Sequence, residues 1–327
     1  MEVAAAAATG RRPPYPGAPF ELSVLTLTVN ATNGPEDGAG TVGLLRRARE
    51  AGITTFDTVD SPDDTLAEAW IARAFPWGDP SIVVLARGGA EGAKSAASRA
   101  LARGAPVAAF SEAGPPRREG APSYRFRHLY EVDASDPGPT VPHPVAQGPP
   151  TGAGPAEPVV LRCRSLEEIV EASHRPPPRV LSGSYSLLEQ ALAATAEEVI
   201  GTGGFAWVAR DPLAGGRLDG SRFASGSMGA GAAGPRTLRE LEVDFEAVAR
   251  LGFLAKPRRR TLAQAALHFV LGQPWVATAC LPIPTAERWA EIVGFGSSPP
   301  LDEGERARVE ALPGRPTATP AHGGPRR

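Results

Sequence analysis

The feature that most constrains this chain is a repeated alternation of short apolar runs with longer amphipathic segments. Short apolar runs are typical of fully buried parallel strands. Seven of them are expected to form strands, at 22–29, 53–57, 81–86, 158–163, 179–184, 205–209 and 276–281. One further strand is expected between 86 and 158, and either 106–110 or 126–133 could supply it.

The segments between these runs have the spacing of amphipathic helices. We expect helices at 41–51, 63–75, 92–104, 165–174, 187–200, 261–273 and 285–294. Their starts carry capping residues, and Ser165 followed by Glu168 has the pattern of a capping box.

Eight strands separated by helices predict an α/β fold, a closed (β/α)8 TIM barrel that binds ligands at the carboxyl ends of its strands. The alternative is an open, doubly wound sheet. It is disfavoured because no glycine-rich phosphate-binding turn follows any of the strands.

The chain is rich in glycine and proline, with 37 and 35 of its 327 residues. Such segments cannot bury enough apolar surface to order themselves. We therefore expect disordered tails at 1–20 and 314–327, around a single barrel at 21–313 with insertions near 111–123, 134–158 and 225–236. The prolines of 134–158 predict a loop in place of the helix after the fourth strand. That loop would leave apolar surface open to a protein partner.

Composition excludes several classes of function. A formal net charge of −2 gives no field that would attract nucleic acid or an anionic membrane. No run of eighteen apolar residues is present, and the N-terminus lacks the order of a secretory signal. Cys163 and Cys280 are expected to be buried free thiols, so we predict a cytoplasmic protein. The histidines lack metal-ligand spacing, and the basic run 258–260 is expected to be solvated.

Four stretches, in order, resemble the aldo/keto reductase superfamily. "LLRRAREAGITTFDTVD" at 44–60 is similar to the family's L-L-R-x-A-x-E-x-G-I-x-x-F-D-T-A motif, and "SYSLLEQ" at 184–190 to its Y-S-L-L-x-R segment. "DPLAGGRLDG" at 211–220 resembles S-P-L-A-G-G-x-L-x-G, and 266–292 resembles the last helix, strand and cofactor turn. The resemblance covers about 40 to 320 and implies the same barrel.

In that family, a tyrosine supported by a lysine, an aspartate and a histidine protonates the carbonyl that NADPH reduces. Asp57 matches the aspartate. Pro62 stands at the tyrosine position, Arg87 at the lysine and Asp133 at the histidine. The candidate catalytic residues are therefore Asp57, Arg87 and Asp133. Proline offers no proton, and arginine stays protonated.

The cofactor positions implied by the resemblance are also substituted. Arg162 and Cys163 stand in place of the Ser-Asn pair that holds the nicotinamide amide, and Ser182 in place of a glutamine. Arg210 replaces the aromatic ring that stacks on the nicotinamide. Candidate residual contacts to a cofactor are Arg162, Arg210, Leu213 and Thr285.

Asp57 has two interpretations. It could form a structural ion pair with Arg87 on the next strand. It could instead belong to a charged ring around an open pocket suited to a small polar or anionic ligand. The ring would consist of Asp57, Asp60, Arg87, Asp133, Arg162 and Arg210.

We therefore expect a barrel that has lost NADPH-dependent reduction and serves as a small-ligand-binding or partner protein without a cofactor. The alternative is an active enzyme. It would be either an NADP(H)-dependent reductase with a rearranged acid or a cofactor-independent catalyst that uses the acids and arginines of the pocket.

Overall fold

The structure, a computed structural model, describes residues 10–13, 21–29, 39–59, 64–75, 81–87, 127–133, 160–174, 179–201, 204–223 and 238–312. Its strands are β1 (Arg11–Arg12), β2 (Leu22–Ser23), β3 (Leu25–Thr28), β4 (Thr55–Asp57), β5 (Val83–Arg87), β6 (Arg127–Asp133), β7 (Val160–Arg162), β8 (Val180–Ser184), β9 (Ala206–Arg210) and β10 (Val276–Pro282). Its α-helices are α2 (Ala39–Glu50), α3 (Asp64–Ala74), α5 (Leu166–Ser173), α6 (Ala191–Ile200), α7 (Leu238–Ala249), α8 (Leu262–Leu271), α9 (Ala286–Val293) and α10 (Glu303–Glu310).

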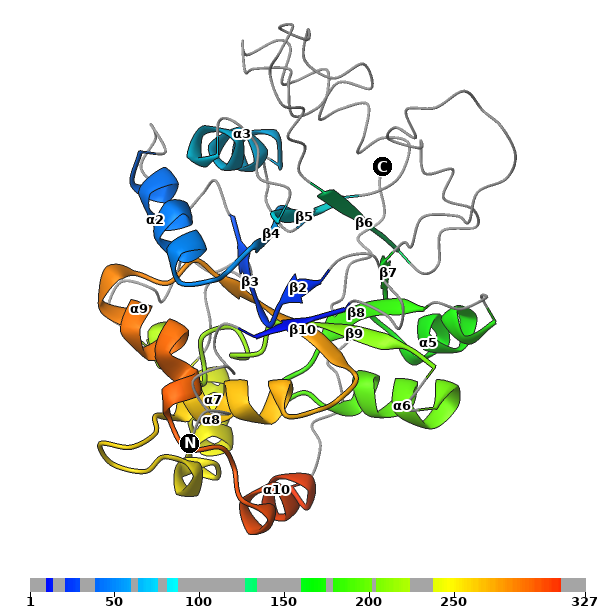
Figure 1. The fold of residues 1–327 in the computed structure, drawn as a ribbon. Helices are drawn as coiled ribbons and strands as arrows, with labels where there is room; N and C mark the ends of the chain where they lie inside the picture. The colour runs from blue at the N-terminus through cyan, green and yellow to red at the C-terminus, as the bar shows by residue number, and fades with distance from the viewer. Residues whose placement is uncertain are drawn as a thin grey trace, which may run out of the picture.

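Strands β3 to β10 form one curled, parallel sheet with helices around it (Figure 1). Each strand pairs with the next along the chain, and β10 pairs with both β9 and β3, so the ladder returns to its start. The predicted α/β fold with a parallel sheet is confirmed, and 126–133 rather than 106–110 supplies the fourth strand. The helix expected at 92–104 and the segment 134–158 lie outside the described residues. The complete (β/α)8 repeat therefore stays a prediction.

Alternate residues of each strand enter two separate apolar layers. On β9, Trp207 and Ala209 pack in the cluster that also contains α8 residues, so they face the helices. Ala206 and Val208 belong to a smaller cluster inside the sheet. Cys280 lies in this inner layer and Cys163 in the outer one, and both are buried free thiols, as expected.

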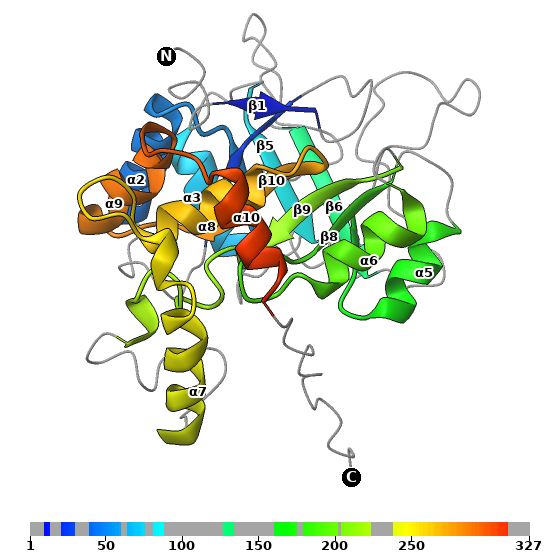
Figure 2. The same cartoon turned by 90° about the horizontal axis from the view of Figure 1, so that it is seen from below.

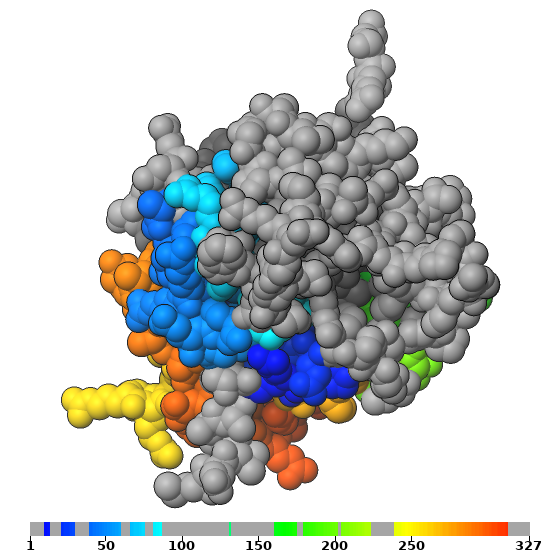
Figure 3. All heavy atoms as spheres, turned by 45° about the horizontal axis from the view of Figure 1, so that its top comes forward, coloured from blue at the N-terminus to red at the C-terminus, as the bar shows by residue number. Residues whose placement is uncertain are grey.

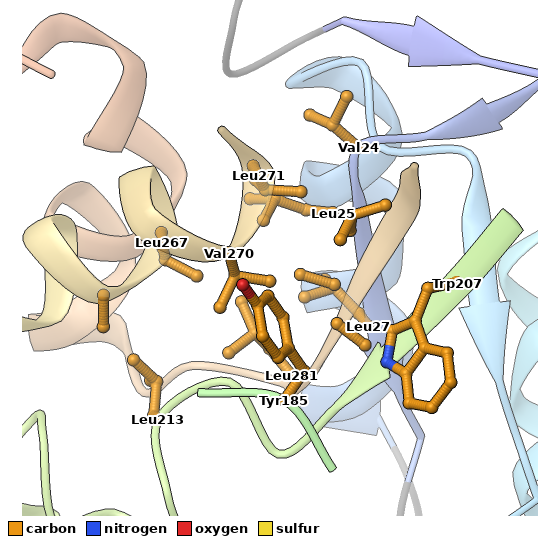
Figure 4. Packing of buried hydrophobic residues seen from close by; sticks show 14 of the residues in the cluster. Val24, Leu25, Leu27, Tyr185, Trp207, Leu213, Leu267, Val270, Leu271 and Leu281 are labelled. Carbon is orange, nitrogen blue, oxygen red and sulfur yellow. The ribbon is translucent and has the colours of Figure 1, made fainter. Parts of the chain in front are cut away.

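The outer layer is closed by helices packed on the sheet. Tyr185 lies there among leucine and valine side chains from β3, β10 and α8 (Figure 4). Its ring contacts those of Phe269 and Trp275, with centroids 5.5 and 5.1 Å away. On the surface, α2 lies against α9 (Figure 3), where the Arg47 guanidinium stacks 4.8 Å from the centre of the Trp289 ring.

Gly183 on β8 provides the space that Trp207 fills. A Cβ atom at Gly183 would lie 2.8 Å from the Trp207 ring and 2.8 Å from the carbonyl oxygen of Cys163. Gly183→Ala is therefore expected to lower the free energy of unfolding by about 1 to 3 kcal/mol, measured by urea denaturation.

The control is Gly43→Ala. Gly43 is exposed within α2, and nothing lies within 4 Å of a Cβ added there. This variant is expected to stabilise the protein by about 0.5 to 1 kcal/mol, because alanine is the better helix former. If Gly183→Ala were as stable as the parent protein, β8 and β9 would be able to move apart without lowering the free energy of unfolding.

Part of the N-terminal segment that was predicted to be disordered is paired. β1 is antiparallel to β2, with Arg11 opposite Ser23. The Arg12 guanidinium donates hydrogen bonds of 2.8, 3.2 and 2.7 Å to the carbonyl oxygens of Leu271, Gln273 and Val276. This arginine satisfies carbonyl groups at and beyond the end of α8, which is where cations stabilise helices.

Two helices were not foreseen. α7 projects away from the barrel (Figure 2), and Leu241, Phe245 and Val248 recur along its sequence at the spacing of a helix. α10 begins at a capping box formed by Asp302 and Glu305. The capping box expected at Ser165 is only half formed, because the Glu168 carboxylate accepts from the Arg164 N–H instead.

The expectation of a solvated basic run at 258–260 is wrong for its last member. Arg258 and Arg259 are exposed, but Arg260 is buried. No helix in the described residues is long and apolar enough to cross a membrane.

Candidate functional site

Four charged side chains from four strands meet inside the sheet at its carboxyl end. Asp57, Arg162 and Arg210 are the last residues of β4, β7 and β9, and Glu131 lies two residues before the end of β6. We call these four residues the mouth cluster. Parallel strands bring their carboxyl ends to one edge, which is where barrels of this type bind ligands.

Asp57 is fully buried, and both of its carboxylate oxygens accept hydrogen bonds. Oδ2 accepts from Arg210 Nη1 at 2.7 Å and from the Thr28 hydroxyl at 2.9 Å. Oδ1 accepts from Arg210 Nη2 at 3.2 Å and from the Val59 N–H at 3.2 Å. These hydrogen bonds hold the Asp57 carboxylate in one orientation.

Arg210 bridges the two carboxylates of the cluster. Besides Asp57, its Nη2 donates to Glu131 Oε2. Burial alone would lower the pKa of this guanidinium. The interactions with Asp57, Cys280 and Glu131 outweigh that effect and raise the pKa above its usual value. Arg210 is therefore a permanent cation in the interior.

Glu131 is the least satisfied member of the cluster. Its Oε2 accepts from Arg210, whereas Oε1 has no hydrogen-bond partner and lies 3.5 Å from Nη1 of Arg162. Burial raises the pKa of the Glu131 carboxyl, and the Arg210 and Arg162 charges oppose that rise. Arg162 reaches toward solvent, with 22% of its side chain exposed.

Asp57 pairs with Arg210 across the barrel, whereas the expected Asp57–Arg87 pair stays a prediction. Strand register places the backbone of Arg87 beside Glu131 and that of Asp133 beside Arg162. The side chains of Arg87 and Asp133 lie outside the described part, as do Asp60 and Pro62. Of the six residues expected in the charged ring, the described part of the structure therefore places three, Asp57, Arg162 and Arg210, at the carboxyl end of the sheet.

Of the four candidate cofactor contacts, two join the mouth cluster and two do not. Arg162 and Arg210 belong to it. Leu213 is buried in the outer apolar layer (Figure 4). Thr285 is exposed at the N-cap of α9, where its side chain accepts no capping hydrogen bond.

The segment after β9, 211–223, is attached to α7 and to the turn before α6. Arg217 bonds to Asp244 at 3.3 Å and to Glu189 at 2.9 Å, and Arg222 bonds to Asp244 at 3.1 Å. Arg288 of α9 donates to the Asp219 carbonyl oxygen. These contacts hold the loop at the same end of the barrel as the mouth cluster.

The sequence interpretation missed Glu131. The signal was present, because Glu131 and Asp133 are two residues apart in "HLYEVD" and so share one face of a strand. Two segments competed for the fourth strand, however, and only the resemblance to the family histidine drew attention to Asp133. Among the described residues, no group of three His, Cys, Asp or Glu side chains is placed to hold a metal ion.

Comparison with known proteins gives agreement in fold. No protein-family model matches the chain, and a search of curated proteins found no match. The chain is similar to the solved structure of aldo-keto reductase AKR11C1 from Bacillus halodurans in its holo form. The TM-score is 0.60 and the identity 17%, over 92% of this chain and 95% of that one. The apo form of the same protein gives a TM-score of 0.58 at 18% identity, over 92% and 94% of the two chains. The chain therefore has the fold of an aldo-keto reductase.

Proposed function

We propose that this chain is an aldo-keto reductase-type (β/α)8 barrel that has lost NADPH-dependent carbonyl reduction. It binds a small polar or anionic ligand at the carboxyl ends of its strands instead. The observation that carries this proposal is the bonding of Arg210 to both Asp57 and Glu131 inside the barrel.

Asp57 is the one catalytic position of the family that the sequence retains. In an active site it would support a proton donor. Here its two oxygens accept four hydrogen bonds, two of them from Arg210. A carboxylate so engaged has no lone pair directed at a reacting group, which supports a structural role for Asp57 in positioning Arg210.

The described residues do not fit a nicotinamide cofactor. The resemblance assigns Arg210 to the stacking aromatic, but its guanidinium points into the barrel and is bonded to two carboxylates. The Ser182 hydroxyl, at the position of the glutamine, is buried and makes no hydrogen bond. Neither residue supplies the stacking or amide contact that would hold the ring beside a carbonyl.

The alternative is an enzyme that uses a rearranged acid or works without a cofactor. The unsatisfied Glu131 Oε1 favours it, because a carboxyl with a raised pKa can donate a proton. A protein partner, docked where the sequence predicts loop in place of a helix, remains a further proposal.

Titration of NADPH against the purified protein distinguishes a ligand-binding barrel from an NADPH-dependent reductase. The signal is the fluorescence of the cofactor. We expect no saturable binding, because each missing charge-assisted hydrogen bond costs about 1.5 to 3 kcal/mol. A reductase known to be active, titrated in parallel, is the positive control. A dissociation constant near or below about one micromolar would contradict the proposal and favour the oxidoreductase.

A further inference from the structure

The last described segment of the chain, 298–312, is attached to the barrel by side chains. We call it the C-terminal strap, and it contains α10. Within the described residues, its backbone-to-backbone hydrogen bonds run inside the strap or to Phe295. The Arg260 guanidinium donates to two of its carbonyl oxygens and bonds to Glu305, which Lys256 also contacts at 2.8 Å. A segment held in this way can open locally while the sheet stays intact.

His268 of α8 lies against the first residue of the C-terminal strap. Its ring is buried, with Nε2 3.0 Å from both the carbonyl oxygen and the hydroxyl oxygen of Ser298. The Ser298 hydroxyl donates to the Phe295 carbonyl oxygen at 2.6 Å, so Nε2 must carry the hydrogen and donate to Ser298. Nδ1 is then the nitrogen that would take up a second proton.

A second proton on this ring is disfavoured while the strap is closed. Burial lowers the pKa of His268 below its usual value, the hydrogen bond to Ser298 opposes that fall, and the charges of Arg260 and Arg306 add to it. Opening the strap would expose the ring and take Ser298 and Arg306 away from it, since both belong to the strap. The open form therefore binds a proton more readily than the closed form.

We propose that the C-terminal strap is an acid-sensitive element, which protonation of His268 releases from α8 while the parallel sheet stays closed. Because the proton binds the open form more tightly, closure is complete above about pH 6.5 and is progressively lost below it. Release would uncover Leu301 and Val309, which are buried in the outer apolar layer. The inference does not depend on which ligand the barrel binds.

His268 is the group to which this proton is assigned. The charges that act most on its ring are Arg260, in the turn before α8, and Arg306 of α10. The other buried or half-buried ionisable groups on the elements around α8 are Arg12, Tyr185, Lys256, Cys280, Arg288, Glu291 and Glu305. Burial alone would raise the pKa of Glu305, but hydrogen bonds from Arg260 and Lys256 lower it to about 2, so this carboxylate stays ionised in mild acid.

The test is amide hydrogen exchange, read by mass spectrometry between about pH 7.5 and 5 and corrected for the intrinsic exchange rate at each pH. Protection of the amides of α10 is expected to fall below about pH 6.5, by up to about tenfold per pH unit. Protection in β8 and β9 should change less over the same range, because the sheet does not open with the strap.

Three variants assign the roles. His268→Gln keeps an N–H donor toward Ser298 but cannot be protonated, so protection of α10 should no longer depend on pH in this range. His174→Gln is the matched control, because His174 is exposed at the end of α5, and it should behave like the parent. Arg306→Gln removes a cation near the ring, so the fall in protection should be smaller. Circular dichroism checks that each variant is folded.

Several results would overturn the inference. They are constant protection of α10 down to pH 5, the same pH dependence in His268→Gln as in the parent, and equal loss of protection in the strap and in β8 and β9. If His268→Gln does not fold, the imidazole of His268 is titrated by NMR in the parent, and a pKa at or above about 6.5 would be equally contrary. Binding of NADPH, whether tight or absent, leaves this inference unaffected.

Discussion

Replacing Arg210 by leucine is expected to lower the free energy of unfolding by about 3 to 5 kcal/mol. The change removes the cation that bonds to Asp57 and Glu131, and both carboxylates are then buried without it. Losing one partner of a buried ion pair costs more than the pair itself contributes, because the remaining charge stays desolvated. Urea denaturation followed by circular dichroism measures the loss.

Two further variants control for this result. Arg210→Lys retains the positive charge but cannot bond to two carboxylates in the same planar geometry, so its loss should be intermediate. Arg239→Leu removes an exposed arginine of α7 and should change stability by less than about 0.5 kcal/mol. A loss below about 1 kcal/mol for Arg210→Leu would mean that water already solvates the cluster.

The second large effect is expected at Arg260. Its guanidinium donates to the carbonyl oxygens of Leu254, Pro299 and Pro300 and bonds to Glu305 at 2.7 Å. Arg260→Met is expected to lower the free energy of unfolding by about 3 to 5 kcal/mol, since three carbonyl oxygens and a buried carboxylate lose their donor. Arg259→Met, one residue earlier and exposed, should change it by less than about 0.5 kcal/mol.

The loss in free energy of unfolding that Arg260→Met causes should depend on pH. Burial alone would raise the pKa of Glu305, but hydrogen bonds from Arg260 and Lys256 lower it to about 2. Because the folded pKa lies below the ordinary value of 4.5, this stabilisation is complete above about pH 4.5 and is lost as the pH falls toward 2. The difference between the parent and Arg260→Met should therefore narrow over that range. Equal losses for Arg259→Met and Arg260→Met at neutral pH would contradict the structural role.

Most of the fold could be predicted, because buried parallel strands are continuous apolar runs and the helices between them are amphipathic. β8 and β9 followed directly from that pattern. α7 was missed although Leu241, Phe245 and Val248 recur at helical spacing in its sequence. The fourth strand stayed ambiguous until its pairing with β5 and β7 was known, since a single strand carries no information about its neighbours.

The candidate site was predicted only in part. The sequence alone placed Asp57, Arg162 and Arg210 at or beside the ends of expected strands, and it indicated that the tyrosine, lysine and aromatic positions implied by the resemblance are substituted. Which charges pair was decided by the closure of the sheet, which brings Arg210 to Asp57 across 153 positions of the chain. Likewise, three consecutive arginines have the same side chain, yet only Arg260 is buried. Local sequence determines which side chains are present and on which face of an element they lie. Desolvation and pairing of charges depend on groups that only the tertiary structure brings within hydrogen-bonding distance.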